Sequence, residues 1–163
     1  KLEQALRQAI SNLVAMRETE GSNIYGDFIK RADLIAEKLA VIEERSPQVV
    51  EEYQIRLSDR INELLAKHNQ VIEPERLLQE VAIFADRTSI TEEIVRLKSH
   101  IKQFKLIIDA DQPVGRKLDF LIQEFNREAN TIASKANDYT LAQVIVEIKA
   151  EIEKIREQIQ NIE

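Results

Sequence analysis

Two glutamates one helical turn apart, Glu124 and Glu128, are the residues of this sequence best suited to hold a cation. Carboxylates at this spacing share one face of a helix and can bind a hard divalent cation, with water completing its shell. Further polar residues accompany the pair: Asp119, Gln123, Asn126, Arg127, Asn130 and Lys135. Asn and Gln are weak or neutral helix formers, so their presence indicates specific hydrogen bonding. A polar network inside an oligomer interface explains the same residues, and both interpretations stay open.

A second polar group, consisting of Glu93, Arg96 and His100, flanks an apolar stripe in a neighbouring segment. Seven residues rise about 10 Å along a helix, so Glu93 and His100 share one ion only if another helix adds ligands. The alternative is that His100 is an ordinary boundary histidine whose polar atoms are satisfied.

A basic ridge runs beside this group, where Lys98, Lys102 and Lys105 follow each other at steps of four and three. No acidic residue lies between Glu93 and Asp109. Such a ridge could track the phosphates of a nucleic acid. A solvated lysine face is an equally valid explanation of these residues alone.

The elements that position these groups are helices, because apolar residues recur at helical spacing along nearly the whole chain. We expect about six of them: a long first helix over 1–45, a bundle over 47–136 and a C-terminal helix over 139–162. Ser46 and Pro47 predict a break, since Ser is a favoured N-cap and Pro a favoured first helical residue. Further connections are expected near 68–70, 86–89, 109–115 and 137–138.

Both ends of the chain carry heptad seams. The first contains Leu2, Leu6, Ala9, Leu13 and Met16, and the last contains Leu141, Ile145, Ile148, Ile152, Ile155, Ile159 and Ile162. These patterns predict long coiled-coil-like terminal helices, with the first helix as the antiparallel partner of the last. A parallel trimer is the alternative, because Ile at both seam positions favours three strands.

Composition narrows the class of protein. The chain has 163 residues, 32% of them charged, a net charge of −6 and only three Gly and three Pro. This excludes a turn-rich β-sandwich or barrel and predicts a single all-α domain. No segment has the roughly 20 apolar residues of a membrane span, and the absence of Cys excludes disulfides and thiolate metal sites. The first residue is Lys, so we expect the chain to be the C-terminal part of a longer protein.

Several segments resemble, in order and spacing, the YicC-like family of bacterial proteins. They are Gly115–Lys135, Glu75–Glu80, Glu92–His100, the tail Glu147–Glu163 and the segment Met16–Gly21, which is similar to the start of the family's C-terminal domain. The resemblance covers nearly the whole chain. Ser89 departs from the pattern, because an Asp is expected there, and this weakens any role of that loop in binding metal.

The resemblance implies a divalent-metal-dependent endoribonuclease that acts on RNA, including small regulatory RNAs. It also implies a cytoplasmic protein that assembles as a homo-hexamer. The segment 91–135 carries eight basic and seven acidic residues, so the acidic excess of the chain lies elsewhere. This distribution of charge is favourable if the segment 91–135 faces the phosphates of RNA.

From these groups we assign candidate roles. The candidate ligands of Mg²⁺ or Mn²⁺ are Glu93, His100, Glu124 and Glu128, and the last three are the candidate catalytic residues. The candidate RNA-binding residues are Lys98, Lys102, Lys105, Arg116, Asn126, Arg127, Asn130 and Lys135. The alternative function is a helical oligomerisation module, with RNA binding and catalysis on a missing N-terminal domain.

Overall fold

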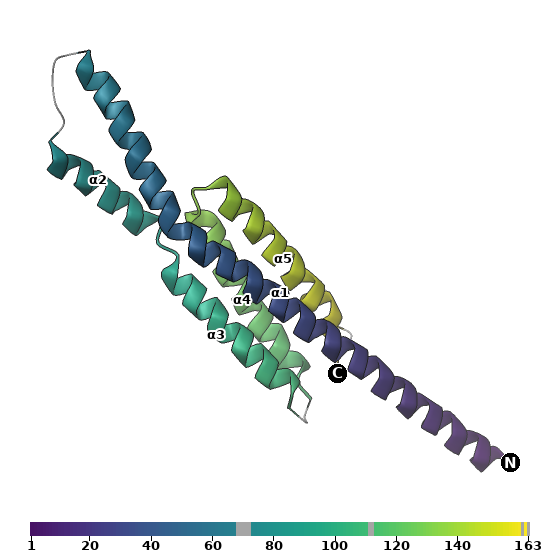
Figure 1. Cartoon of the computed structure of the whole chain (residues 1–163). Coiled ribbons are helices and arrows are strands. Elements are labelled where there is room, and N and C mark those ends of the chain that lie inside the picture. Colours follow the sequence, from purple (N-terminus) through teal and green to yellow (C-terminus); the bar gives the residue numbers. More distant parts are fainter. Residues whose placement is uncertain (68–72, 111–112, 161, 163) are drawn as a thin grey trace.

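The computed structural model describes residues 1–67, 73–110, 113–160 and 162, and over these residues the chain forms five helices and no strand (Figure 1). The helices are α1 (Leu2–Ala66), α2 (Pro74–Arg87), α3 (Thr91–Ile108), α4 (Gly115–Lys135) and α5 (Tyr139–Ile159). The predicted all-α class is confirmed, whereas the predicted number of about six helices is wrong. The connection expected at 68–70 lies outside the described residues.

The break predicted at Ser46–Pro47 does not occur, because α1 continues through Pro47 to Ala66. An interior proline costs about 3 kcal/mol, since it removes one backbone hydrogen bond and crowds the preceding turn. Contacts on both sides offset this cost. Ile42 and Val49 are both buried, one on each side of the proline. Figure 1 shows α1 changing direction between the part that lies along the bundle and its far end.

Four helices form an antiparallel bundle, in which α1 packs against α3 and α5 while α4 packs against the other faces of α3 and α5. Ion pairs fix the directions. Arg31 pairs with Glu151 and Arg45 with Asp138, so α5 runs opposite to α1. Helix α2 lies outside the bundle against the far end of α1, where Tyr53 stacks on Phe84 with ring centroids 3.7 Å apart.

A single apolar core fills the bundle, and its centre is aromatic. Phe28 of α1, Phe104 of α3 and Phe125 of α4 are buried, and the ring centroids of consecutive members lie 5.5 and 5.9 Å apart. Most of the remaining buried residues lie on one apolar face of each of the helices α1, α3, α4 and α5. This core holds α3 and α4 side by side, which brings their polar faces together.

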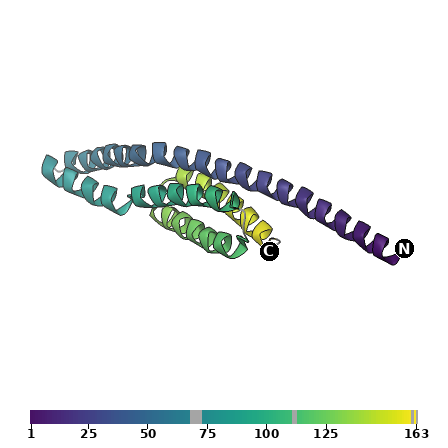
Figure 2. The ribbon, with the colours of Figure 1, turned by 90° about the horizontal axis from the view of Figure 1, so that it is seen from below.

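The coiled-coil description of the terminal helices is wrong in detail. The apolar seam of α5 is buried, but it faces α4 as well as α1, so the helix belongs to a bundle and not to a two-stranded coiled coil. The N-terminal seam of α1 is exposed, with Leu2, Leu6 and Leu13 retaining 89%, 61% and 56% of their accessible surface. Figure 2 shows this part of α1 projecting beyond the other helices. Across the described residues, no helix has the length and apolar character needed to span a bilayer.

Arg45 joins α1 to the start of α5. Its guanidinium donates hydrogen bonds to Asp138 at 2.7 Å and to Glu52 at 2.5 Å, and Asp138 also caps α5 by accepting from the backbone N–H of Leu141. The hydrogen bond from Arg45 is the main reason why the pKa of both carboxyl groups lies below its ordinary value. The bond from Arg45 to Glu52 spans Pro47 and supports the continuous helix.

Replacing Arg45 by Gln is expected to lower the melting temperature at pH 7, and the difference from wild type should shrink as the pH falls below about 4. A lowered carboxyl pKa adds stability above the pKa of the unfolded chain, and this stability is lost as the pH falls through the folded value. Thermal unfolding between pH 7 and pH 3 tests this. Arg7→Gln is the matched control, because the Arg7–Glu3 pair is exposed and should contribute little. A difference that stays constant down to pH 3 would contradict the assignment.

Candidate metal and RNA site between α3 and α4

An open groove of about 620 Å³ lies between α3 and α4, and we call it the α3–α4 groove. Helix α3 contributes His100, Gln103 and Ile107, one helical face at steps of three and four. Helix α4 contributes the residues Arg116, Lys117, Phe120, Leu121, Glu124 and Arg127. Because the two helices are antiparallel, the middle of one lies opposite the middle of the other, which places His100 near Glu124.

Three candidate metal ligands meet at this groove: His100 and Glu124 line it, and Glu128 lies beside them. One ligand atom each from His100, Glu124 and Glu128 lies within 4.8 Å of the others. The Glu128 carboxylate is buried, with 2% of its side-chain surface exposed, and the Glu124 side chain is 21% exposed. Both ring nitrogens of His100 are buried and have no hydrogen-bond partner among the described residues. The His100 ring lies against Phe125, with centroids 6.4 Å apart.

The two carboxylates already have a cationic partner. Arg127 contacts Glu124 at 2.9 Å and Glu128 at 3.1 Å, and Arg96 lies 4.0 Å from Glu128. Arg96 also pairs with Glu92 on its own helix. A buried carboxylate is costly without a positive partner, and these arginines compensate the charge of Glu128.

Glu93, the fourth candidate ligand, is not part of this group. It is buried and accepts a hydrogen bond from Lys135 at 2.8 Å. Burial by itself raises the pKa of Glu93, but the hydrogen bond from Lys135 and the charges of Lys135 and Arg96 bring it below its ordinary value. Glu93 and Lys135 therefore form an ion pair that joins α3 to α4 two turns away from His100.

The basic ridge lies on the side of α3 away from the groove. At 100° per residue, Lys98 and Lys102 are each about 160° around the helix from His100. Lys98 pairs with Glu43 of α1 and Lys105 pairs with Asp33 of α1, so both side chains are directed to α1 and not to the groove. Lys102 is exposed and has no ion pair among the described residues.

Asn126 and Asn130 lie on another side of α4, in a hollow that faces α5. Asp119, Gln123, Arg127 and Arg156 line the same hollow. Gln123 donates to Asp119 at 3.0 Å, one turn along the helix. Arg127 lines both this hollow and the α3–α4 groove, so its side chain stands between the two asparagines and the carboxylates.

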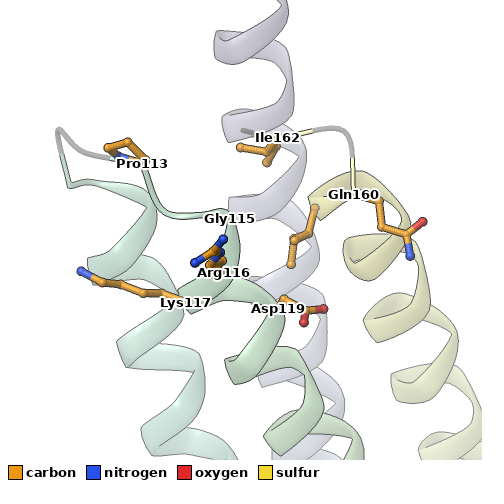
Figure 3. A pocket seen from close by; sticks show the side chains of 8 residues that line it. Pro113, Gly115, Arg116, Lys117, Asp119, Gln160 and Ile162 are labelled. Carbon is orange, nitrogen blue, oxygen red and sulfur yellow. The ribbon is translucent and has the colours of Figure 1, made fainter.

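The first two turns of α4 add two groove residues that the candidate sets omit, Lys117 and Phe120. Figure 3 shows Lys117 extending toward α3 and Asp119 on the side of α5, with Arg116 between them. Phe120 keeps 64% of its surface exposed. Lys117 and Phe120 precede Glu124 by seven and four residues, a helical spacing that could have identified both.

Comparison with known proteins agrees with the resemblance seen in the sequence. The family model described as "Endoribonuclease YicC-like, C-terminal" matches residues 42–163, and so begins downstream of Met16–Gly21. A protein of Clostridioides difficile (strain 630) named "Probable endoribonuclease YicC" is 52% identical over 162 residues, which is 99% of this chain and 55% of that protein. A protein of the same name from Haemophilus influenzae is 37% identical over 159 residues, or 98% of this chain and 54% of that protein. This chain spans about half the length of these curated relatives, and it belongs to the YicC-like endoribonuclease family.

Proposed function

We propose that the α3–α4 groove is a divalent-metal-dependent endoribonuclease site that cuts RNA, including small regulatory RNAs. The protein acts as a homo-hexamer. One observation carries the proposal. A histidine whose buried ring nitrogens have no partner among the described residues lies within 4.8 Å of two carboxylates. Buried polar atoms without partners are rare in native proteins, and a ligand is one explanation for them.

The donor set fits the ion. Glu124 and Glu128 supply carboxylate oxygens, which Mg²⁺ and Mn²⁺ prefer, and His100 supplies one imidazole nitrogen. A divalent ion bound there would polarise a phosphate oxygen and lower the pKa of a bound water or 2′-hydroxyl. Glu93 is not needed as a ligand, because it is already paired with Lys135.

The other groove residues bind and orient the RNA. The guanidinium groups of Arg116 and Arg127 match the oxygens of a phosphate and hold the backbone at the carboxylates. Lys117 binds a flanking phosphate as a point charge. The exposed ring of Phe120 offers a surface on which an unpaired base can stack.

The decisive experiment is cleavage of a structured small RNA by this chain and by the full-length protein, each with Mn²⁺ and with EDTA. We expect both proteins to cut with Mn²⁺ and neither to cut with EDTA. Cutting by this chain would support a site built from α3 and α4 alone. Cutting by the full-length protein only would contradict that and favour the second candidate function.

That second candidate is an assembly module, and the exposed seam of α1 favours it. Leu2, Leu6, Leu13 and Met16 stand on a helix that projects from the bundle, and an exposed apolar stripe of this kind is typical of a helix that packs against a partner. In this case α1 would join copies of the protein or contact the rest of the chain. The groove would then position RNA for residues outside these helices.

A further inference from the structure

Arg127 occupies the position of a replaceable counter-ion in the α3–α4 groove. Its two terminal nitrogens contact two different carboxylates, Glu124 at 2.9 Å and Glu128 at 3.1 Å. These carboxylates are two of the three groups that lie within 4.8 Å of one another with His100. The single positive charge of Arg127 therefore sits where the proposed divalent ion would be held.

Charge balance makes the guanidinium and a divalent ion competitors. Two carboxylates carry two negative charges, which one divalent ion neutralises by itself. With such an ion bound, Arg127 would face a like charge a few ångströms away, in a groove where Arg96 is already 4.0 Å from Glu128. The buried Glu128 needs a cation at all times, so Arg127 can leave at low cost only when another cation takes its place.

Arg127 is able to make this exchange without a change in the backbone. Its side chain is 59% exposed, whereas the Glu128 side chain is 2% exposed. It also borders the hollow that contains Asn126 and Asn130, which gives the guanidinium space on the outer side of α4. On release, this long and largely exposed side chain regains hydration and rotamer freedom, which offsets part of the loss of its two ion pairs.

We propose that Arg127 couples metal binding to RNA binding. In the ion-free protein it neutralises Glu124 and Glu128, and a divalent cation displaces it. The released guanidinium turns outward, where it binds an RNA phosphate beside Asn126 and Asn130. This inference rests on the proposed metal site and adds that one side chain makes the two ligands cooperative.

The coupling must be reciprocal, because binding free energies are linked. Mn²⁺ should increase the affinity for RNA, and RNA should increase the affinity for Mn²⁺ by the same factor. Without Arg127 the cation no longer competes with an internal group, so Mn²⁺ should bind more tightly in the absence of RNA. The gain in affinity on adding RNA should then disappear.

The test measures Mn²⁺ affinity of the full-length protein by titration calorimetry, with and without a 2′-O-methyl RNA that lacks the 2′-hydroxyl nucleophile. Wild type, Arg127→Gln and the control Arg116→Gln are compared at one salt concentration. Arg116 lines the same groove, and its replacement removes the same positive charge. Among the described residues, Arg116 forms no ion pair with Glu124 or Glu128, so both carboxylates keep their partners. For Arg127→Gln we expect about tenfold tighter Mn²⁺ binding and no gain from RNA, within the usual range of coupling between sites. In the absence of RNA, Arg116→Gln should change the Mn²⁺ affinity far less than Arg127→Gln does.

The outcomes separate the inference from the proposed function. If wild type binds Mn²⁺ and Arg127→Gln binds it with the same affinity and the same gain from RNA, the inference is overturned and the metal site stands. If Arg116→Gln tightens Mn²⁺ binding as much as Arg127→Gln does, general charge explains the effect and the inference is again overturned. If neither wild type nor Arg127→Gln binds Mn²⁺, the proposed metal site fails and the inference fails with it.

Discussion

Replacing Glu124 and Glu128 together by Gln is expected to reduce Mn²⁺-dependent RNA cleavage by about 10²–10⁴-fold, because the metal's charge stabilisation is worth several kcal/mol. Gln keeps the length of the side chain and a carbonyl oxygen that can still accept a hydrogen bond from Arg127. It removes the two negative charges that a divalent ion requires. Single-turnover cleavage of a structured RNA measures the loss, and circular dichroism checks that the helices remain.

The control for this double variant is Asp119→Asn on the same helix. Asp119 is exposed, pairs with Gln123 and lies on the side of α4 that faces α5. Its replacement removes a carboxylate of α4 but leaves the groove intact, so cleavage should stay within about twofold of wild type, as for most surface substitutions. Normal cleavage by the double variant would exclude this carboxylate pair as the catalytic site.

Structural features that depend on a single helix were predicted correctly from the sequence. The connections expected near 86–89 and 137–138 and the start of α4 at Gly115 agree with the observed helix boundaries, because helix ends depend on local capping and turn signals. The pairing of Glu124 with Glu128 was also predictable, since four residues make about one turn. The predicted break at Pro47 was wrong because the effect of this proline on α1 depends on contacts with α5. The local sequence contains no information about these contacts.

The parts of the site that were not predictable depend on how one helix is rotated against another. His100 and Glu93 lie on nearly the same face of α3, yet only His100 reaches the two glutamates, because the antiparallel packing sets Lys135 opposite Glu93. The side of α3 that carries Lys98 is directed to α1 for the same reason. Such rotations follow from the fit of buried side chains across several helices, which is a property of the whole core.

The fit of that core makes a prediction for Phe125, which is fully buried between Phe104 and His100. Phe125→Ala should reduce the free energy of unfolding by about 3–5 kcal/mol, the usual cost of removing a buried aromatic ring. A domain of this kind has a total stability of about 5–15 kcal/mol, so this single change would remove a large part of it. Urea unfolding followed by circular dichroism measures the loss as a shift of the midpoint.

Phe120→Ala is the matched control, because Phe120 is on the same helix and 64% exposed. Its loss should change the free energy of unfolding by no more than about 0.5 kcal/mol. Equal effects at both positions would show that α4 does not pack as described. The comparison also bears on the site, because the Phe125 ring supports His100 opposite Glu124. If contact with Phe125 positions His100, the Phe125→Ala variant should bind Mn²⁺ more weakly than the Phe120→Ala variant. The comparison is made at a temperature where both variants stay folded, and neither phenylalanine is a candidate ligand of the ion.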